Sequence, residues 1–241
     1  MSGFRCPNPC GTWPICQIPM PIKHDALIIV AAGHGRRFGS DKQQALIHKL
    51  PVLVHTCKAL TLGFKTTVVV THSVNHTASQ LLQHGIAATC VAGGETRAHS
   101  VWNGLCALNE SEYARVWIHD GARPVVSNAL CTRLDHGLGT ADGCIPTLPI
   151  TDTIKRITTE TGVKTVDRSV LVRVQTPQIF RLSRLKYAFT QTQSWEAFTD
   201  DASVIEAIGG SITCVTGCPN NIKITLPEDC AYIEALGIML Y

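Results

Sequence analysis

The sequence predicts an α/β protein with a doubly wound, mostly parallel Rossmann-like sheet. Apolar or β-branched runs of strand length, such as 26–31 and 66–71, alternate along the chain with segments of helical length. The composition agrees, because 45% of the 241 residues are hydrophobic and 16% are charged, as in globular proteins. In such sheets ligands bind beyond the carboxyl ends of the strands.

The expected elements alternate in chain order. Pro51 suits a helix start and Gly63 its stop, Thr96 and Asn128 are candidate caps, and Pro227 suits the start of the last helix. We expect strands at 26–31, 66–71, 87–92, 116–119 and 143–149, and helices at 51–60, 75–84, 96–108, from 128 onward and at 226–236.

Residues 151–174 interrupt this alternation. They are rich in Thr, Val and Arg, lack a helical stripe and contain a turn at Thr161-Gly162, which favours a projecting two-stranded β-ribbon. Because an isolated ribbon cannot bury its own surface, we expect this arm to pack on a second subunit and the protein to be a homodimer.

Bulk properties exclude several classes of protein. The net charge of +3 is too small for a nucleic-acid-binding surface, and no apolar run approaches the length of a membrane span. Residues 1–24, rich in Pro and Cys, form an expected extension before a single domain at 25–241. Most of the 11 cysteines lie singly in apolar segments, as expected of buried thiols in a cytoplasmic protein.

The loop after the first strand is the strongest local signal. It holds three glycines (33, 35 and 39) and three cations (Arg36, Arg37 and Lys42), a combination that favours phosphate binding. The spacing matches neither the ATPase phosphate loop nor the dinucleotide fingerprint. Taken alone, the loop could also be an ordinary glycine-rich turn.

Four more polar segments follow strand ends or lie in the arm, and they would share one rim with this loop. They are 93–100, 120–123, the arm with Asp152 to Arg168, and 221–225. Asp120 is the candidate Mg²⁺ ligand, because this ion usually takes one or two carboxylates plus phosphates. The histidines are scattered, and no catalytic base is needed if the nucleophile is already an anion.

Together these motifs resemble the 2-C-methyl-D-erythritol 4-phosphate cytidylyltransferases of the non-mevalonate isoprenoid pathway. The resemblance extends from Ala26 to about Gly237. It rests on 31–39 (AAGHGRRFG), 42–43 (KQ), 93–101 (GG, Arg97, Ser100-Val101), 119–124 (HDGARP), 152–155 (DTIK), 166–168 (VDR), 175–178 (QTPQ), 199–203 (TDDAS) and 221–225 (NIKIT).

The resemblance implies a role for each matching residue. Arg37, Lys42 and Lys223 would be catalytic cations, the first two stabilising charge at the α-phosphorus of CTP. Asp120 would hold Mg²⁺ between phosphates. The expected nucleotide-binding residues are Ala31, Ala32, Gly33, Gly35, Gly94, Glu95 and Ser100. The expected residues for methylerythritol phosphate are Asp120, Gly121, Arg123, Thr153, Arg168, Thr176 and Lys223, with Thr153 and Arg168 reaching in from the partner subunit.

The sequence departs from the family pattern at a few positions. Asp41 replaces a proline before Lys42 and is expected to pair with a cation and loosen the loop, while Glu95, Gly121 and Asn220 are milder changes. The chain ends at Tyr241, so no downstream cyclase activity is expected. The alternatives are a cytidylyltransferase for another polyol phosphate such as ribitol 5-phosphate, a pyrophosphorylase using another nucleotide, or a non-catalytic nucleotide-binding protein.

Overall fold

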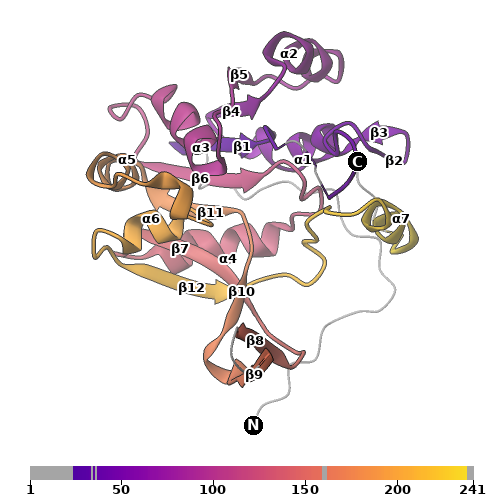
Figure 1. Cartoon of the computed structure of the whole chain (residues 1–241). Helices are drawn as coiled ribbons and strands as arrows, with labels where there is room; N and C mark the ends of the chain where they lie inside the picture. The colour runs from indigo at the N-terminus through magenta and orange to yellow at the C-terminus, as the bar shows by residue number, and fades with distance from the viewer. Residues whose placement is uncertain (1–23, 34, 36, 159–161, 238–241) are drawn as a thin grey trace.

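The computed structural model describes residues 24–33, 35, 37–158 and 162–237. An eight-stranded sheet forms its centre, with strand order β10-β7-β11-β6-β1-β4-β5 and β12 paired to β7 (Figure 1). The strands are β1 (Ala26–Val30), β4 (Thr66–Thr71), β5 (Thr89–Ala92), β6 (Arg115–Asp120), β7 (Gly143–Pro149), β10 (Val172–Val174), β11 (Gln178–Arg181) and β12 (Ile212–Thr216). Strands β5, β4, β1 and β6 are mutually parallel, whereas β11 and β10 run antiparallel to their neighbours, so the expected mostly parallel sheet is confirmed.

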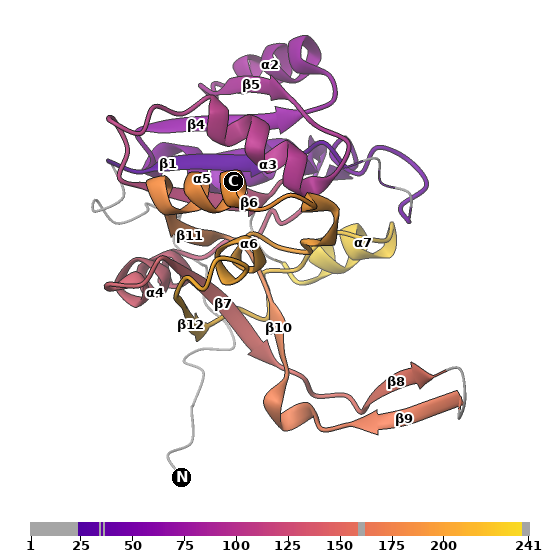
Figure 2. The same ribbon diagram turned by 60° about the vertical axis from the view of Figure 1, so that its left-hand side comes forward.

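Helices cover both faces of this sheet, as Figure 2 shows. They are α1 (Val52–Leu60), α2 (Val74–Gln83), α3 (Arg97–Cys106), α4 (Asn128–Leu138), α5 (Leu182–Gln191), α6 (Ala202–Glu206) and α7 (Glu228–Ala235). Strand β1 divides its side chains between the two faces with the strand period of two: Leu27 and Ile29 pack with α1 and α4, and Ala26 and Ile28 with α3 and α5. Within the described residues, no helix combines the length and the apolar character that crossing a bilayer requires.

The helix starts agree with the sequence at one cap and differ at another. The Thr96 hydroxyl accepts the His99 N–H at 3.2 Å and caps α3, as expected. The expected cap of α4, Asn128, is wrong. The preceding Ser127 is the cap, because it has an extended backbone and its hydroxyl accepts the Leu130 N–H at 3.3 Å.

A small hairpin precedes α1 and was not expected from the sequence. It pairs β2 (Leu46–Ile47) with β3 (Leu50–Pro51) through a turn in which His48 and Lys49 both have positive φ. Ile47 packs in a separate apolar cluster with Ala122, Ile224 and Ile233. This cluster joins the hairpin to the turn after β6 and to the C-terminal segment with α7, and the last two include the polar rim segments 120–123 and 221–225.

The expected ribbon is present. Strands β8 (Ile154–Thr158) and β9 (Gly162–Val166) pair antiparallel and project from the body of the molecule (Figure 2). Thr161 of the expected turn lies outside the described residues. Residues 172–174, assigned to the arm from the sequence, belong instead to the main sheet as β10, because they pair with β7.

Candidate active site

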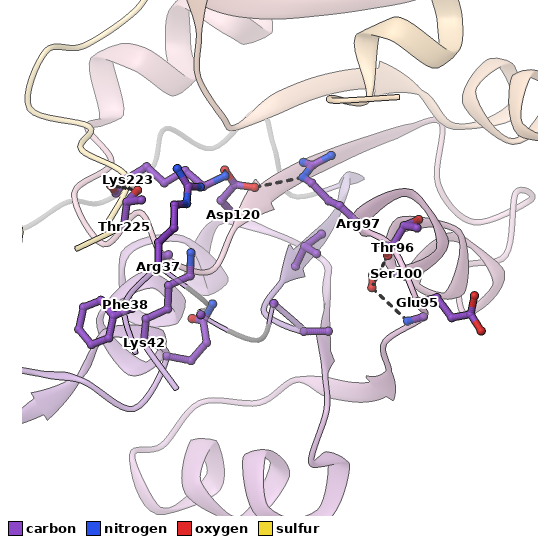
Figure 3. A pocket seen from close by; sticks show the side chains of 17 residues that line it. Arg37, Phe38, Lys42, Glu95, Thr96, Arg97, Ser100, Asp120, Lys223 and Thr225 are labelled. Atoms are coloured by element: carbon purple, nitrogen blue, oxygen red, sulfur yellow. Dashed lines mark hydrogen bonds and ion pairs between the residues drawn. The ribbon is translucent and has the colours of Figure 1, made fainter. Parts of the chain in front are cut away.

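A cavity of about 430 Å³ lies at the carboxyl ends of β1, β5 and β6. The loop after β1 and the C-terminal segment bring Arg37, Lys42 and Lys223 to one side of it, close to Asp120, and the start of α3 brings Thr96 and Ser100 to the other (Figure 3). Of the residues expected from the sequence, the lining contains Ala32, Gly33, Gly35, Arg37, Lys42, Gly94, Glu95, Ser100, Asp120 and Lys223. Ten of the candidate residues therefore line one cavity in the structure.

The loop after β1 turns sharply at Gly35. Its φ of +59° is left-handed, and a Cβ there would meet the Ser40 carbonyl oxygen at 2.2 Å, so glycine is required. The same residue accepts backbone hydrogen bonds from Phe38 and Gly39, which folds the loop back toward the cavity. His34 and Arg36 lie outside the described residues.

Asp41 shapes the approach to Lys42 by a local hydrogen bond. Its Oδ1 accepts the Gln43 N–H at 3.0 Å, and its carbonyl accepts the Gln44 N–H at 3.0 Å. An aspartate that accepts the amide two residues on forms an Asx-turn, which fixes the backbone without a proline. The expected loosening of the loop is therefore opposed by this turn.

Two glycines let the segment after β5 pack closely. A Cβ on Gly93 would meet the Ala32 Cβ at 2.2 Å, and one on Gly94 would meet the His99 Cβ at 2.4 Å. The Gly94 N–H then donates to Ser100 Oγ at 3.1 Å, and Ser100 donates to the Thr96 carbonyl at 3.0 Å. Small side chains and oriented backbone groups therefore form this wall.

Asp120 is the electrostatic centre of the site. Its carboxylate is buried and lies 2.7 Å from Lys223 Nζ, 3.3 Å from Arg97 Nε and 3.4 Å from Arg123 Nε. Burial alone would raise the pKa of Asp120, but the Arg97, Lys223 and Arg123 charges outweigh it and hold the pKa well below its usual range. Asp120 therefore stays ionised.

Lys42 lies in the same cavity, where its Nζ approaches the Ile224 carbonyl at 3.4 Å. Burial lowers the pKa of Lys42, and the Lys223 and Arg37 charges lower it further against the opposing effect of Asp120. A concentration of positive charge of this kind is costly in the protein alone and suits a polyanionic ligand such as a triphosphate.

Arg97 and Asp201, to which the sequence assigns no role, complete the charge network. Arg97 donates to both Asp201 carboxylate oxygens, at 2.9 and 2.8 Å, and also reaches Asp120. Asp201 is almost fully buried. The sequence motifs contain both residues, but only the fold shows that they pair.

A second cavity of about 410 Å³ adjoins the first and shares Arg97, Asp120 and Lys223 with it. Two more expected residues, Arg123 and Thr176, line this second cavity. Asp120 and Lys223 thus stand between two neighbouring spaces, each of a size that holds a small molecule.

Four expected residues lie outside both cavities. Ala31 and Gly121 line neither cavity and lie next to each other, since a Cβ on Gly121 would be 3.0 Å from the Ala31 Cβ. Thr153 and Arg168 lie near the base of the ribbon, and Arg168 donates to the Thr151 carbonyl and lines a separate hollow there. Within one chain, the fold does not bring these two ribbon residues to Asp120.

Asp120 is the candidate residue for a divalent cation. Its buried carboxylate offers the hard oxygen ligands that Mg²⁺ prefers. In the part of the chain that the structure describes, no three His, Cys, Asp or Glu side chains gather as a metal site. The residues present therefore fit an ion that is completed by phosphate oxygens and water rather than one held by the protein alone.

Comparison with known proteins agrees with this geometry. Residues 26–238 match the family model described as IspD, 2-C-methyl-D-erythritol 4-phosphate cytidylyltransferase. A curated protein of that name from Cereibacter sphaeroides is 39% identical over 218 residues, which cover 88% of this chain and 96% of the relative. A "Bifunctional enzyme IspD/IspF" from Rhodospirillum rubrum is 39% identical over 217 residues, and the chain spans only 56% of that relative's length.

Solved structures give the same result. The Francisella tularensis 2-C-methyl-D-erythritol 4-phosphate cytidylyltransferase superposes with a TM-score of 0.75 at 30% identity, covering 88% of this chain and 99% of that one. The bifunctional IspDF of Campylobacter jejuni gives a TM-score of 0.73 at 31% identity, covering 85% of this chain and 53% of that one. With its sheet, its paired cavities and these relatives, the chain belongs to the 2-C-methyl-D-erythritol 4-phosphate cytidylyltransferase family.

Proposed function

We propose that this chain is a nucleotidyltransferase that couples CTP to 2-C-methyl-D-erythritol 4-phosphate, giving 4-diphosphocytidyl-2-C-methyl-D-erythritol and pyrophosphate. The observation that carries the proposal is the pair of adjacent cavities that share Asp120 and Lys223. A transferase that joins two phosphorylated molecules needs two binding spaces that meet where charge develops, and it needs cations at that meeting point.

The first cavity is assigned to CTP. Arg37 and Lys42 approach from the glycine-rich loop, while the backbone around Ala32, Gly94 and Ser100 offers a wall for the base and the ribose. Ala31, Gly33, Gly35 and Glu95 complete the proposed nucleotide site. Ala31 is buried and lines neither cavity, so it would act through the position of its backbone rather than by direct side-chain contact.

The second cavity is assigned to the polyol phosphate, with Arg123 and Lys223 as candidate phosphate ligands and Thr176 beside them. Gly121 lines neither cavity and would act only through the backbone of the turn after Asp120. A phosphate oxygen of this substrate attacks the α-phosphorus in line, the bond from that phosphorus to the β-phosphate oxygen breaks, and pyrophosphate leaves. No general base is required, because the phosphate is already ionised at neutral pH. Lys42 and Lys223 neutralise the charge that grows on the non-bridging and leaving oxygens.

Asp120 would hold Mg²⁺, which when bound draws charge from the phosphate oxygens. The carboxylate is fixed for this role by Arg97 and Arg123, and it remains ionised because of the cations around it. A cytoplasmic location is a further expectation for this activity.

A homodimer would complete the site. The ribbon exposes Ile157 and Val163, which pair across β8 and β9 and are 86% and 59% exposed, and Val170 at its base is 78% exposed. An apolar surface of this kind on a projecting element suits contact with another subunit. Thr153 and Arg168 would then reach the polyol phosphate of the partner.

The test is pyrophosphate release with CTP against a panel of polyol phosphates that includes methylerythritol and ribitol phosphates, repeated with UTP, GTP and ATP. Preference for CTP and methylerythritol phosphate supports the proposal. Equal or better turnover of ribitol 5-phosphate would reassign the second substrate, and CTP binding without pyrophosphate release from any pair would make the chain a nucleotide-binding protein.

A further inference from the structure

His119 is a fully buried histidine at the end of β6, next to Asp120 in sequence. Its ring lines neither cavity, so it cannot reach a substrate as an acid or a base. Both of its ring nitrogens nevertheless have partners: Nε2 lies 3.0 Å from the Arg123 carbonyl oxygen, and Nδ1 lies 3.1 Å from Thr176 Oγ1.

These partners determine which nitrogen carries the proton. A carbonyl oxygen only accepts hydrogen bonds, so Nε2 must be the protonated nitrogen of the neutral ring. Nδ1 then has a lone pair and accepts the hydroxyl proton of Thr176. The Thr176 oxygen in turn accepts the Asp120 backbone N–H at 3.0 Å. Each donor in this chain of bonds therefore has one acceptor.

The bonds hold both ends of a tight turn. The turn runs from Asp120 to Arg123, whose N–H donates to the Asp120 carbonyl at 3.1 Å. His119 fixes the Arg123 carbonyl directly and the Asp120 amide through Thr176. The first and last side chains of this turn are the proposed cation ligand, Asp120, and the proposed phosphate ligand, Arg123, so an error in the turn would misplace both.

These bonds also limit the hydrogen bonds that the Thr176 hydroxyl can donate. Its single hydroxyl proton is given to His119, so the hydroxyl has no proton left for a ligand. A phosphate dianion offers only acceptors. A direct hydrogen bond from Thr176 to the substrate phosphate is therefore incompatible with this arrangement, although Thr176 borders the second cavity.

We propose that His119, with its proton on Nε2, and Thr176 form a positioning pair that fixes the Asp120–Arg123 turn, and that Thr176 does not bind the substrate phosphate through its hydroxyl. The catalytic consequence rests on the proposed function, since it assumes that Asp120 and Arg123 act on Mg²⁺ and phosphate. The hydrogen-bond arrangement itself does not depend on that assumption.

The arrangement can be tested without activity, by ¹⁵N NMR of the histidine rings in the full-length protein. His119→Gln identifies the His119 signals by their loss. We expect a protonated Nε2 and a bare Nδ1 at neutral pH, with the Nδ1 shift changing in Thr176→Val. A proton on Nδ1 would overturn the proposal, whether or not the protein proves to be a cytidylyltransferase.

The kinetic test uses Thr176→Val, His119→Gln and the double variant, with pyrophosphate release followed as Mg²⁺ is varied. Loss of a residue that hydrogen-bonds and orients a metal ligand typically lowers metal affinity or activity about 10- to 100-fold. Each single variant should therefore lower kcat and raise the half-saturating Mg²⁺ concentration by amounts of that order. Because both changes break one linkage, the double variant should be no worse than the worse single variant within about twofold.

Three comparisons separate positioning from other roles. Thr176→Ser keeps the hydroxyl and should recover most of the activity that Thr176→Val loses. Thr77→Val removes another buried hydroxyl, which contacts Thr71 at 2.9 Å and lines neither cavity, and should leave the Mg²⁺ dependence unchanged. The proposal is overturned if Thr176→Val raises only the KM of the polyol phosphate while His119→Gln is silent, since a direct phosphate contact gives that result.

Discussion

Lys223 Nζ lies 2.7 Å from Asp120 Oδ2, so a lysine of the C-terminal segment and the carboxylate at the end of β6 form an ion pair between the two cavities. The pair connects the two proposed functions of the site, because one partner is the candidate Mg²⁺ ligand and the other a candidate phosphate ligand. A divalent cation on Asp120 would compete with Lys223 for the same oxygen and free the ammonium group for a phosphate.

Replacement of Lys223 by alanine separates these two effects. We expect turnover to fall about 100-fold, since a cation that meets developing charge is typically worth that much. The half-saturating Mg²⁺ concentration should fall at the same time, because the competing ammonium group is gone. Pyrophosphate release measured against Mg²⁺ gives both values. Lys186→Ala is the control, since Lys186 pairs with Glu110 away from the site; near-normal release by Lys223→Ala would remove Lys223 from the catalytic set.

Lys42 should limit the rate at alkaline pH. Its pKa lies below the usual value because of burial and the nearby Lys223 and Arg37 charges, so it loses its proton at a lower pH than a surface lysine. The neutral amine cannot offset phosphate charge, and kcat/KM for CTP, which reports the ionisation of the free enzyme, should therefore decline as pH rises through the lowered pKa. Lys42→Ala should reduce turnover sharply at every pH. Lys42→Arg stays charged and should lose the alkaline decline, whatever its absolute rate; an unchanged decline would assign that limb to another group.

Much of the fold followed from the sequence because its signals are local. Buried runs such as 66–71 and the Thr96 cap depend on neighbouring residues and were found where expected. Ser127 and Asn128 are both good caps, and only the backbone conformation distinguishes them. The turn at His48 and Lys49 could not be expected, since it uses positive φ without Gly or Asn.

The candidate site, like the fold, could be predicted from the sequence only in part. Residues that follow strand ends, such as Lys42 and Asp120, could be placed on one rim by topology alone. The pairing of Arg97 with Asp201 joins positions 104 residues apart, at the start of α3 and just before α6, and depends on the tertiary fold. The hydrogen-bond chain through His119 depends on how the segment with Thr176 meets the end of β6, which only the structure shows. The identity of the substrates came from the family resemblance and from no local pattern.

The ribbon makes a prediction about subunits. If Arg168 serves the partner's site, Arg168→Ala should raise the KM of the polyol phosphate and spare CTP binding, which calorimetry can measure. Mixing inactive Lys42→Ala dimers with Arg168→Ala dimers, after dissociation and reassociation, should restore activity. Half of the resulting dimers would be mixed, and each would hold one intact site, so about a quarter of all sites would be intact.

A matched mixture controls this complementation. Lys42 and Lys223 line the same cavity of one chain, so Lys42→Ala mixed with Lys223→Ala should produce no intact site and no recovery. Recovery in both mixtures would mean that the activity does not come from sites shared between subunits, for example because parent protein contaminates the preparations. A loss of CTP affinity in Arg168→Ala, or no recovery in the first mixture, would contradict a shared site.

Asp41 offers a final test, at the position where relatives are expected to have proline. Its Oδ1 accepts the Gln43 N–H at 3.0 Å and so fixes the backbone on either side of Lys42. Asp41→Ala removes the acceptor, and a hydrogen bond of this kind is worth about 1 kcal/mol, or roughly fivefold in affinity. We therefore expect the KM of CTP to rise by about that factor in Asp41→Ala. Asp41→Asn keeps a side-chain oxygen at the same place and should stay close to the parent protein, because the turn and not the negative charge is what it supplies. If Asn behaved like Ala in steady-state kinetics at fixed ionic strength, the charge of Asp41 would be the important property and the Asx-turn would not explain how this chain dispenses with proline.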